Sequence, residues 1–458
     1  MKARNILIFI LGALIFPAYL ASCGEDRWAA YAEQTKTDLW IDDTMRVWYY
    51  WNENMPASKY LNYFSAPSTF FTSLLSSSDK FSSIDSLTSA VSTRSIPYTD
   101  YSYGFQFTTN RVEGNDTALY AHVLYVADES PASAINLKRG DWIMDMNGEP
   151  ITSKNYAKLY GSAAMQLTVG YYDADNDTIV AYNEPRQIVS ARSINDNPVH
   201  YTNVYTSGSK KIGYLVYNHF SSGVTESSQE YNNNLRKAFR EFSSHGVSEF
   251  ILDLRYNNGG LLSCAELLCA MLAPASAFGQ ELGYLEFNNR TNPRNVPFTL
   301  NKELIQNGAN LNLSTLYVLT SNQTASASEM VINCLKPLMN NVIIIGSTTV
   351  GKNVGSLTFS NPDLKITMSP IVCKIYNSEG KSDYESGFTP QYSVSENNDM
   401  ARFLPFGNTN EIMLATALEL ISKGTVTKST TNTSPKTAVI NNSIERRANH
   451  SVKLNKKK

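Results

Sequence analysis

The stretch from Leu316 to Ser356 constrains the fold of this 458-residue chain most, because short apolar runs alternate with polar turns along it. Leu316 to Leu319 is a short apolar run bounded by polar residues, which predicts a buried strand. From Glu329 onwards, apolar residues recur at the spacing of one helix face: Met330, Val331, Cys334, Leu335 and Leu338. Val342 to Ile345 predicts a second strand, so this stretch is expected to form a strand–helix–strand unit.

Two side chains at the ends of this unit suit nucleophilic catalysis. Ser326 lies where the first strand turns into the helix, and the first-turn amides of a helix can stabilise an oxyanion. Lys352 follows the second strand and can act as a base only as a neutral amine, which burial beside the apolar strand favours. From these residues alone an alternative stays open, in which Ser326 caps the helix and Lys352 is a solvated loop lysine.

A second unit of the same kind begins near Lys211. Ile212 to Val216 predicts a strand, and Phe250 to Leu254 predicts the next one. Between them, one apolar helix face ends at Gly246: Tyr231, Leu235, Ala238, Phe239 and Phe242. The unit ends in Asp253-Leu254-Arg255-Tyr256-Asn257-Asn258-Gly259-Gly260, where two adjacent glycines leave backbone amides accessible. By itself this segment favours a structural turn.

Taken together, Ser326-Ala327-Ser328-Glu329, Gly351-Lys352 and the segment Asp253 to Gly260 resemble the C-terminal processing (tail-specific) serine peptidases. The resemblance implies Ser326 as the nucleophile, Lys352 as the general base, and amides of Gly259 or Gly260 and Ala327 as the oxyanion hole. Many relatives carry glutamine four residues after the lysine. Ser356 stands there in this chain, so a Ser-Lys dyad is predicted, with Ser356 as a candidate third member.

From Ile96 to Arg192 the pattern changes to short strands and turns, and the segment resembles a PDZ domain. Tyr103-Gly104-Phe105-Gln106-Phe107 resembles its carboxylate-binding loop, and Leu137 to Ile143 and Asn147 to Ile151 match later parts in order. The resemblance implies that an edge strand and its loop amides capture an extended peptide C-terminus. The alternative is an inert β-rich spacer.

The first 23 residues read as a targeting signal rather than as fold. Lys2 and Arg4 precede an apolar run from Ile6 to Phe16, which is too short for a typical membrane span. Leu20-Ala21-Ser22-Cys23 then resembles a lipobox, which implies lipidation of Cys23. Gly24-Glu25-Asp26 resembles a surface-export signal of Gram-negative lipoproteins. We expect a lipid-anchored protein of the Gram-negative envelope, at the outer membrane or cell surface; the alternative is an uncleaved anchor or a free cysteine.

Composition limits the classes of molecule that this chain is expected to bind. The formal net charge of −2 argues against bulk electrostatic binding of nucleic acid. The five histidines show no metal-ligand spacing and the chain has no CxxC, so we expect neither a metal nor another cofactor. The expected partners are protein or peptide substrates and, through the lipid, a membrane. A disulfide among the cysteines cannot be assigned from the sequence.

The expected fold is multidomain α/β. It comprises a signal peptide (1–23), an N-terminal helical cap (24–95), a PDZ-like β-rich domain (96–198), a crotonase-like ββα catalytic core (199–424) and a disordered basic tail (425–458). The cap includes a short helix from Pro67 to Leu75, and the core ends in a helix containing Ile412 and Leu420.

The expected function is a serine endopeptidase that cleaves exported or misfolded proteins and recognises their C-termini. One alternative is an inactive peptide-binding lipoprotein that keeps the fold. Another is a hydrolase with a Ser-His-Asp triad of the lipase type. No G-x-S-x-G motif surrounds Ser326, and His219 and His245 precede it, against the usual order of that triad.

Overall fold

The computed structural model describes residues 28–86, 101–112, 114–225, 227–291, 295–426, 439–447 and 452–453. The signal segment and Cys23 therefore lie outside the described residues. The chain divides into two compact units. The first holds the described residues up to Val47 together with Trp51–Ser78, and the second holds Trp48–Tyr50 and the chain from Asp79 onwards.

The first unit is helical. It contains most of α2 (Trp28–Trp48), the 3-10 turns η1 (Asn52–Asn54) and η2 (Ser58–Tyr60), and α3 (Pro67–Leu74). α3 begins at a proline, as predicted, because the first helical position needs no amide donor. The Asp42 carboxylate of α2 accepts a hydrogen bond of 2.8 Å from the Tyr63 hydroxyl, and the Tyr63 ring contacts Phe70 of α3. These contacts hold α2 and α3 together.

The central sheet of the second unit has six strands in the order β11-β12-β13-β16-β17-β22. Their bounds are β11 (Val199–Ser207), β12 (Lys210–Tyr217), β13 (Glu249–Asp253), β16 (Thr315–Thr320), β17 (Asn341–Gly346) and β22 (Tyr392–Ser393). The pairs from β12 to β22 are parallel, and β11 is antiparallel to β12. The apolar runs predicted as strands therefore lie side by side in one sheet.

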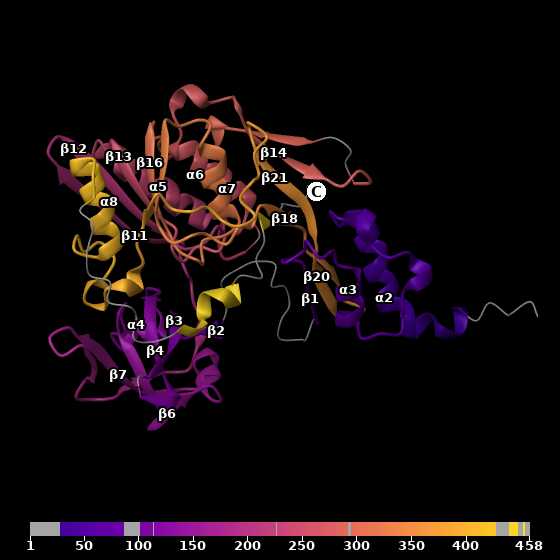
Figure 1. The fold of residues 1–458 in the computed structure, drawn as a ribbon, viewed down its shortest axis with the longest axis horizontal. Helices are drawn as coiled ribbons and strands as arrows, with labels where there is room; N and C mark the ends of the chain where they lie inside the picture. Colours follow the sequence, from indigo (N-terminus) through magenta and orange to yellow (C-terminus); the bar gives the residue numbers. More distant parts are fainter. Residues whose placement is uncertain are drawn as a thin grey trace, which may run out of the picture. The chain divides into compact units, whose positions relative to one another are not determined.

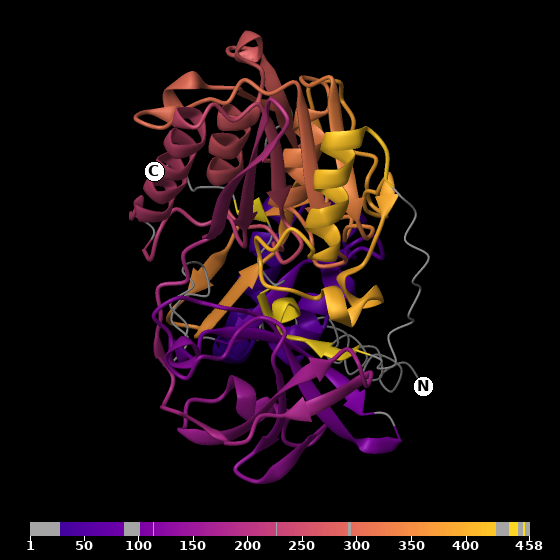
Figure 2. The same ribbon diagram turned by 90° about the vertical axis from the view of Figure 1, so that its left-hand side faces the viewer.

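Helices cover both faces of this sheet (Figures 1 and 2). One face packs on α5 (Glu230–Ser244), α6 (Leu262–Leu272) and α7 (Ala327–Leu335), and the other on α8 (Ile412–Lys423). The helix predicted to run to Leu338 ends earlier, at Leu335. Pro337 explains the difference, because proline has no amide hydrogen with which to continue the helix.

Two smaller sheets follow in the second unit. One has the order β15-β14-β21-β18-β24 and contains β14 (Glu281–Phe287), β15 (Val296–Thr299), β18 (Val354–Ser356), β21 (Ile371–Asn377) and β24 (Val452–Lys453). The other joins β1 (Ser83–Ser86), β19 (Phe359–Asn361) and β20 (Ile366–Ser369). β18 begins two residues after Lys352, so the first of these sheets fixes the segment that carries the predicted base.

The β-rich region forms an eight-stranded sheet with the path β23-β3-β4-β6-β5-β7-β8, and β9 pairs with β7. Its strands are β3 (Phe105–Val112), β4 (Asn115–Val126), β5 (Trp142–Met146), β6 (Glu149–Thr152), β7 (Met165–Asp173), β8 (Thr178–Ala181), β9 (Arg186–Ile188) and β23 (Val439–Asn442). β2 (Tyr101–Ser102) pairs separately with β10 (Arg192–Ser193). A short helix, α4 (Pro131–Ala134), and η3 (Tyr156–Tyr160) lie between these strands in sequence.

The C-terminal segment corrects one prediction. Residues 425–458 were expected to be disordered because they are polar and basic, yet the structure places 439–447 in β23 and the 3-10 turn η8 (Ser443–Arg447), and 452–453 in β24. Composition did not reveal this because backbone pairing with existing sheet edges supplies the order. The rest of the predicted tail beyond Val426 lies outside the described residues.

Candidate active site

Ser326 occupies a strained turn between β16 and α7. Its φ of 63° and ψ of −115° are unusual for a residue other than glycine. Such a conformation costs on the order of 1–3 kcal/mol and needs support from its surroundings. The side chain is fully buried, and its Oγ has no hydrogen-bond partner within the described part of the chain. A buried hydroxyl without a hydrogen-bond partner is uncommon in proteins, and a catalytic role is one explanation for it.

The carboxylate of Glu329 supports this turn. Its Oε2 accepts hydrogen bonds from the backbone amides of Ser326 (2.8 Å) and Lys352 (2.7 Å). Its Oε1 accepts from the Thr349 hydroxyl and the Gly351 amide, both at 2.6 Å. One buried side chain therefore holds the segment that carries the serine against the segment that carries the lysine. Burial raises the pKa of Glu329, although these four donors oppose the rise.

Lys352 is also buried, with 3% of its surface exposed. Its Nζ lies 4.7 Å from the centroid of the Phe81 ring, a distance at which an aromatic face attracts an ammonium. Among the residues that the structure describes, Ser326 Oγ has no hydrogen-bond partner, so it is not hydrogen-bonded to Lys352 Nζ. Glu329 thus brings the backbone amides of the two residues to one carboxylate oxygen.

The predicted oxyanion loop lies directly against Ser326. A Cβ built on Gly259 would come within 2.7 Å of Ser326 Cβ and 3.1 Å of the Ala327 nitrogen, so only glycine fits there. The Gly259 amide, however, donates to Asn257 Oδ1 at 2.9 Å. The other glycine, Gly260, packs against the Phe220 carbonyl. The first helical amide, that of Ala327, needs no intrahelical acceptor and lies beside this loop.

Ser356, the candidate third member, lies at the end of β18 and is fully buried. Its backbone pairs with Ile371 of β21 on one side and with Lys453 of β24 on the other. The structure therefore places Ser356 on the strand that follows Lys352.

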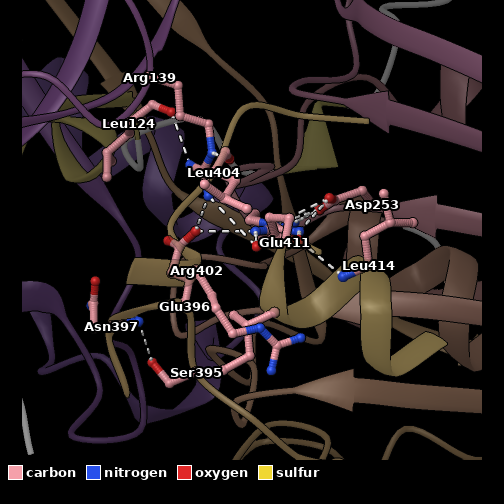
Figure 3. Close-up of polar contacts among 12 residues, drawn as sticks. Leu124, Arg139, Asp253, Ser395, Glu396, Asn397, Arg402, Leu404, Glu411 and Leu414 are labelled. Atoms are coloured by element: carbon pink, nitrogen blue, oxygen red, sulfur yellow. Dashed lines mark hydrogen bonds and ion pairs between the residues drawn. The ribbon is translucent and has the colours of Figure 1, made fainter. Parts of the chain in front are cut away.

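A buried ion network lies at the other end of the oxyanion loop (Figure 3). The Arg255 guanidinium bonds Asp253, Glu396 and Glu411, with 2.8 Å between Nη1 and Glu411 Oε1. Arg139, from the eight-stranded-sheet region, bonds Glu396 Oε2 at 2.8 Å. The hydroxyl of Tyr256, which immediately follows Arg255, accepts from Arg139 and donates to Glu396. Arg139 Nε also donates to the Leu404 carbonyl at 2.9 Å, so this arginine contacts several segments.

 The network thus joins the end of β13, the loop before α8 and the β-rich region.

Burial and charge act against each other in this network. Burial alone would raise the pKa of Glu396, but Arg139 and Arg255 lower it below its ordinary value. Burial likewise opposes ionisation of Glu411, and Arg255 lowers its pKa. Burial raises the pKa of Asp253 in spite of Arg255. Removing one partner of such a network leaves an uncompensated buried charge, which costs about 3–5 kcal/mol.

The predicted peptide-binding loop is built around Gly104. Its φ is 82°, and a Cβ there would lie 2.2 Å from Ser130 Cβ, so the close approach requires glycine. The Gly104 amide donates to Ser102 Oγ at 2.9 Å, and the Tyr103 carbonyl accepts from the Ala132 amide. Phe105, Gln106 and Phe107 begin β3 and pair with β4. The loop therefore leads into a strand that pairs with β4 on one edge and with β23 on the other.

The described part of the chain contains neither a helix that could span a membrane nor a cluster of metal ligands. Residues 28–86, 101–112, 114–225, 227–291, 295–426 and the short C-terminal pieces contain no helix long and apolar enough to cross a bilayer. Within the same ranges, no group of three or more acidic, histidine or cysteine side chains could hold a metal ion.

The described cysteines are buried free thiols: Cys264, Cys269, Cys334 and Cys373. Burial raises the pKa of Cys264 to about 12.

This chain matches the models of a known protein family and resembles a solved structure. The model of peptidase family S41 matches residues 211–394, and the model of the S41 N-terminal domain matches residues 36–83. A crystal structure described as a putative S41 protease from Bacteroides fragilis NCTC 9343 is 44% identical, with a TM-score of 0.77. The match covers 84% of this chain and 97% of that one.

Two curated relatives are more distant. The carboxyl-terminal-processing protease of Picosynechococcus sp. is 23% identical over 308 residues, which are 64% of this chain and 65% of the relative. The chloroplastic carboxyl-terminal-processing peptidase 1 of Arabidopsis thaliana is 24% identical over 237 residues, 51% of this chain and 44% of the relative. The chain thus spans less than two thirds of the length of these curated relatives.

Proposed function

This chain belongs to peptidase family S41, and we propose that it is a serine endopeptidase of exported or misfolded proteins. The observation that carries the proposal is the Glu329 carboxylate, which holds the Ser326 and Lys352 segments together in a buried site. Family membership and this arrangement together favour an active peptidase over an inactive peptide-binding lipoprotein.

In the proposed mechanism, Ser326 Oγ attacks the carbonyl carbon of the scissile peptide while Lys352 Nζ takes the hydroxyl proton. The carbonyl oxygen becomes an oxyanion, which the Ala327 amide and an amide of the glycine pair, Gly259 or Gly260, would stabilise. Collapse of the tetrahedral intermediate breaks the C–N bond, and the leaving amine receives the proton from Lys352. Water then attacks the acyl ester while Lys352 takes a proton from the water. The ester bond breaks, the acid product leaves, and Lys352 returns the proton to Ser326 Oγ.

Two adjustments separate the arrangement described above from this reaction. A hydrogen bond must form between Ser326 Oγ and Lys352 Nζ, and an oxyanion held by Gly259 would require its amide to leave Asn257. Catalytic hydrogen bonds are often long or unformed until substrate binds. Ser356 has no part in the proposed chemistry, which uses a dyad.

We further propose that the eight-stranded-sheet region is a PDZ-like module that recognises C-termini through Tyr103 to Phe107. β3 supports this, because its edge away from β4 already pairs with the extended segment β23 and could pair with an extended peptide in the same way. The helical first unit would act as a cap, and the central sheet as a crotonase-like core. Lipidation of Cys23, with anchoring to the Gram-negative outer membrane or cell surface, is a proposal that rests on the lipobox-like sequence alone.

Incubating the full-length protein with unfolded substrates tests the proposed activity. Mass spectrometry should detect new peptide termini with the wild type and none with Ser326→Ala, because alanine has no nucleophilic oxygen. Ser328→Ala is the matched control. Its hydroxyl donates to the Asn257 carbonyl at 2.9 Å, so its loss should reduce cleavage far less. Equal cleavage by wild type and Ser326→Ala would contradict the proposal.

A further inference from the structure

The C-terminal segment lies on the strand that the proposed function assigns to substrate. β23 pairs antiparallel with β3, with Val439 opposite Asn110 and Asn442 opposite Thr108. Ser443 Oγ accepts from the Phe107 amide at 2.8 Å and donates to Gln106. The segment therefore runs towards the Tyr103 to Phe107 loop, and two of the five loop residues bind it directly.

The same segment continues into an apolar cluster. Ile444 is fully buried and packs with Leu124, Tyr125, Tyr256 and Phe403. By contrast, Ile440, four residues earlier, is 41% exposed. Ile444 is thus a single apolar anchor in a segment that is otherwise polar or exposed.

Contacts from the anchor reach both loops of the proposed catalytic site. Asn258 Nδ2, beside Gly259, donates to the Ile444 carbonyl at 3.1 Å. Gln323 Nε2, three residues before Ser326, lies 3.4 Å from Glu445 Oε1. Further along, β24 pairs in parallel with β18, with Val452 opposite Gly355 and Lys453 opposite Ser356. The described pieces of the C-terminus therefore lie on the predicted peptide-binding strand, beside the serine and oxyanion loops, and on the strand that follows Lys352.

From these contacts we infer that residues 439–447 and 452–453 occupy the substrate path and compete with peptide substrates. The inference deepens the proposed function and rests on it. It also defines the ligand class as an extended polar peptide with one branched apolar side chain at the Ile444 position. A strand edge can pair with only one partner at a time, and an attached segment competes at a high effective concentration.

Full-length variants in a Ser326→Ala background test the occupancy without hydrolysis. A fluorescent peptide with the sequence of residues 439–447 is titrated and followed by anisotropy. Ile444→Asp places a charge in the apolar cluster and should expel the attached segment, so the peptide should bind to this variant at least about tenfold more tightly than to the parent. Ile440→Asp makes the same change at an exposed position and should bind like the parent.

Equal affinities for the parent and Ile444→Asp, or no binding to either, would overturn the inference. If Ile444→Asp lowers the unfolding temperature of the whole protein, Asn442→Pro replaces it. This variant disrupts β23 pairing without placing a charge in the apolar cluster and should give the same gain in affinity. With Ser326 restored, Ile444→Asp should also raise kcat/KM about tenfold. Tighter peptide binding without hydrolysis by any variant would sustain the inference and contradict the proposed peptidase activity instead.

Discussion

Lys352→Arg should lower kcat/KM by roughly three to four orders of magnitude, because general-base catalysis contributes about that much. The substitution keeps a long cationic side chain, but a guanidinium stays protonated and cannot accept the Ser326 proton. In the wild type, kcat/KM should rise with pH as the lysine amine loses its proton. Activity of both proteins is measured against one unfolded substrate across a pH series, with circular dichroism to confirm folding.

Lys336→Arg is the matched control for this change. Like Lys352, Lys336 places its Nζ over an aromatic ring, 3.9 Å from the Phe388 centroid, but it lies outside the proposed site. We expect Lys336→Arg to keep near-wild-type kcat/KM. Full activity in Lys352→Arg would exclude this lysine as the general base and favour a histidine in that role.

Glu329→Gln should reduce kcat/KM by about a hundredfold or more while the protein remains folded. The amide keeps the size of the carboxylate but replaces one acceptor oxygen with an NH2 donor. Because each oxygen accepts two hydrogen bonds, two of the four donors would then face another donor. An unsatisfied buried donor costs about 1–3 kcal/mol, and about 2.7 kcal/mol corresponds to a hundredfold loss of rate.

The readout for Glu329 should separate positioning from folding. We expect kcat to fall more than KM changes, because the carboxylate aligns the serine and lysine segments rather than contacting substrate. Glu266→Gln on α6 is the control, since burial raises the pKa of Glu266 to about 7 and α6 carries none of these four donors. Equal losses in the two variants, or unchanged kcat in Glu329→Gln, would contradict the positioning role.

Local sequence patterns predicted the strands and helices around the site well. The apolar runs at Leu316 to Leu319 and Val342 to Ile345 are β16 and β17, because short buried strands leave a periodic signal in the sequence. The turn at Ser326 and the loop at Gly259 were likewise recognisable from their small residues. The apolar spacing extends to Leu338, but α7 ends at Leu335, because Pro337 cannot donate a backbone hydrogen bond within the helix.

Contacts between residues far apart in sequence could not be predicted in this way. Glu329 appeared only as the start of a helix, whereas its role depends on donors more than 20 residues away. Arg139 meets Glu396 across 257 positions, and β23 meets β3 across more than 300. Such partners are chosen by tertiary packing, and a single sequence carries no periodic signal for them.

Covalent labelling of the wild type tests most directly whether Ser326 is the nucleophile. A fluorophosphonate reacts with an activated serine hydroxyl, loses fluoride and leaves a phosphonyl ester on the oxygen. Peptide mapping by mass spectrometry should locate one adduct, on Ser326, with loss of hydrolysis in proportion to labelling. Lys352→Arg should label far more slowly, and Ser326→Ala should not label at that peptide. An adduct on a different residue whose formation abolishes hydrolysis, with Ser326 unmodified, would contradict the account.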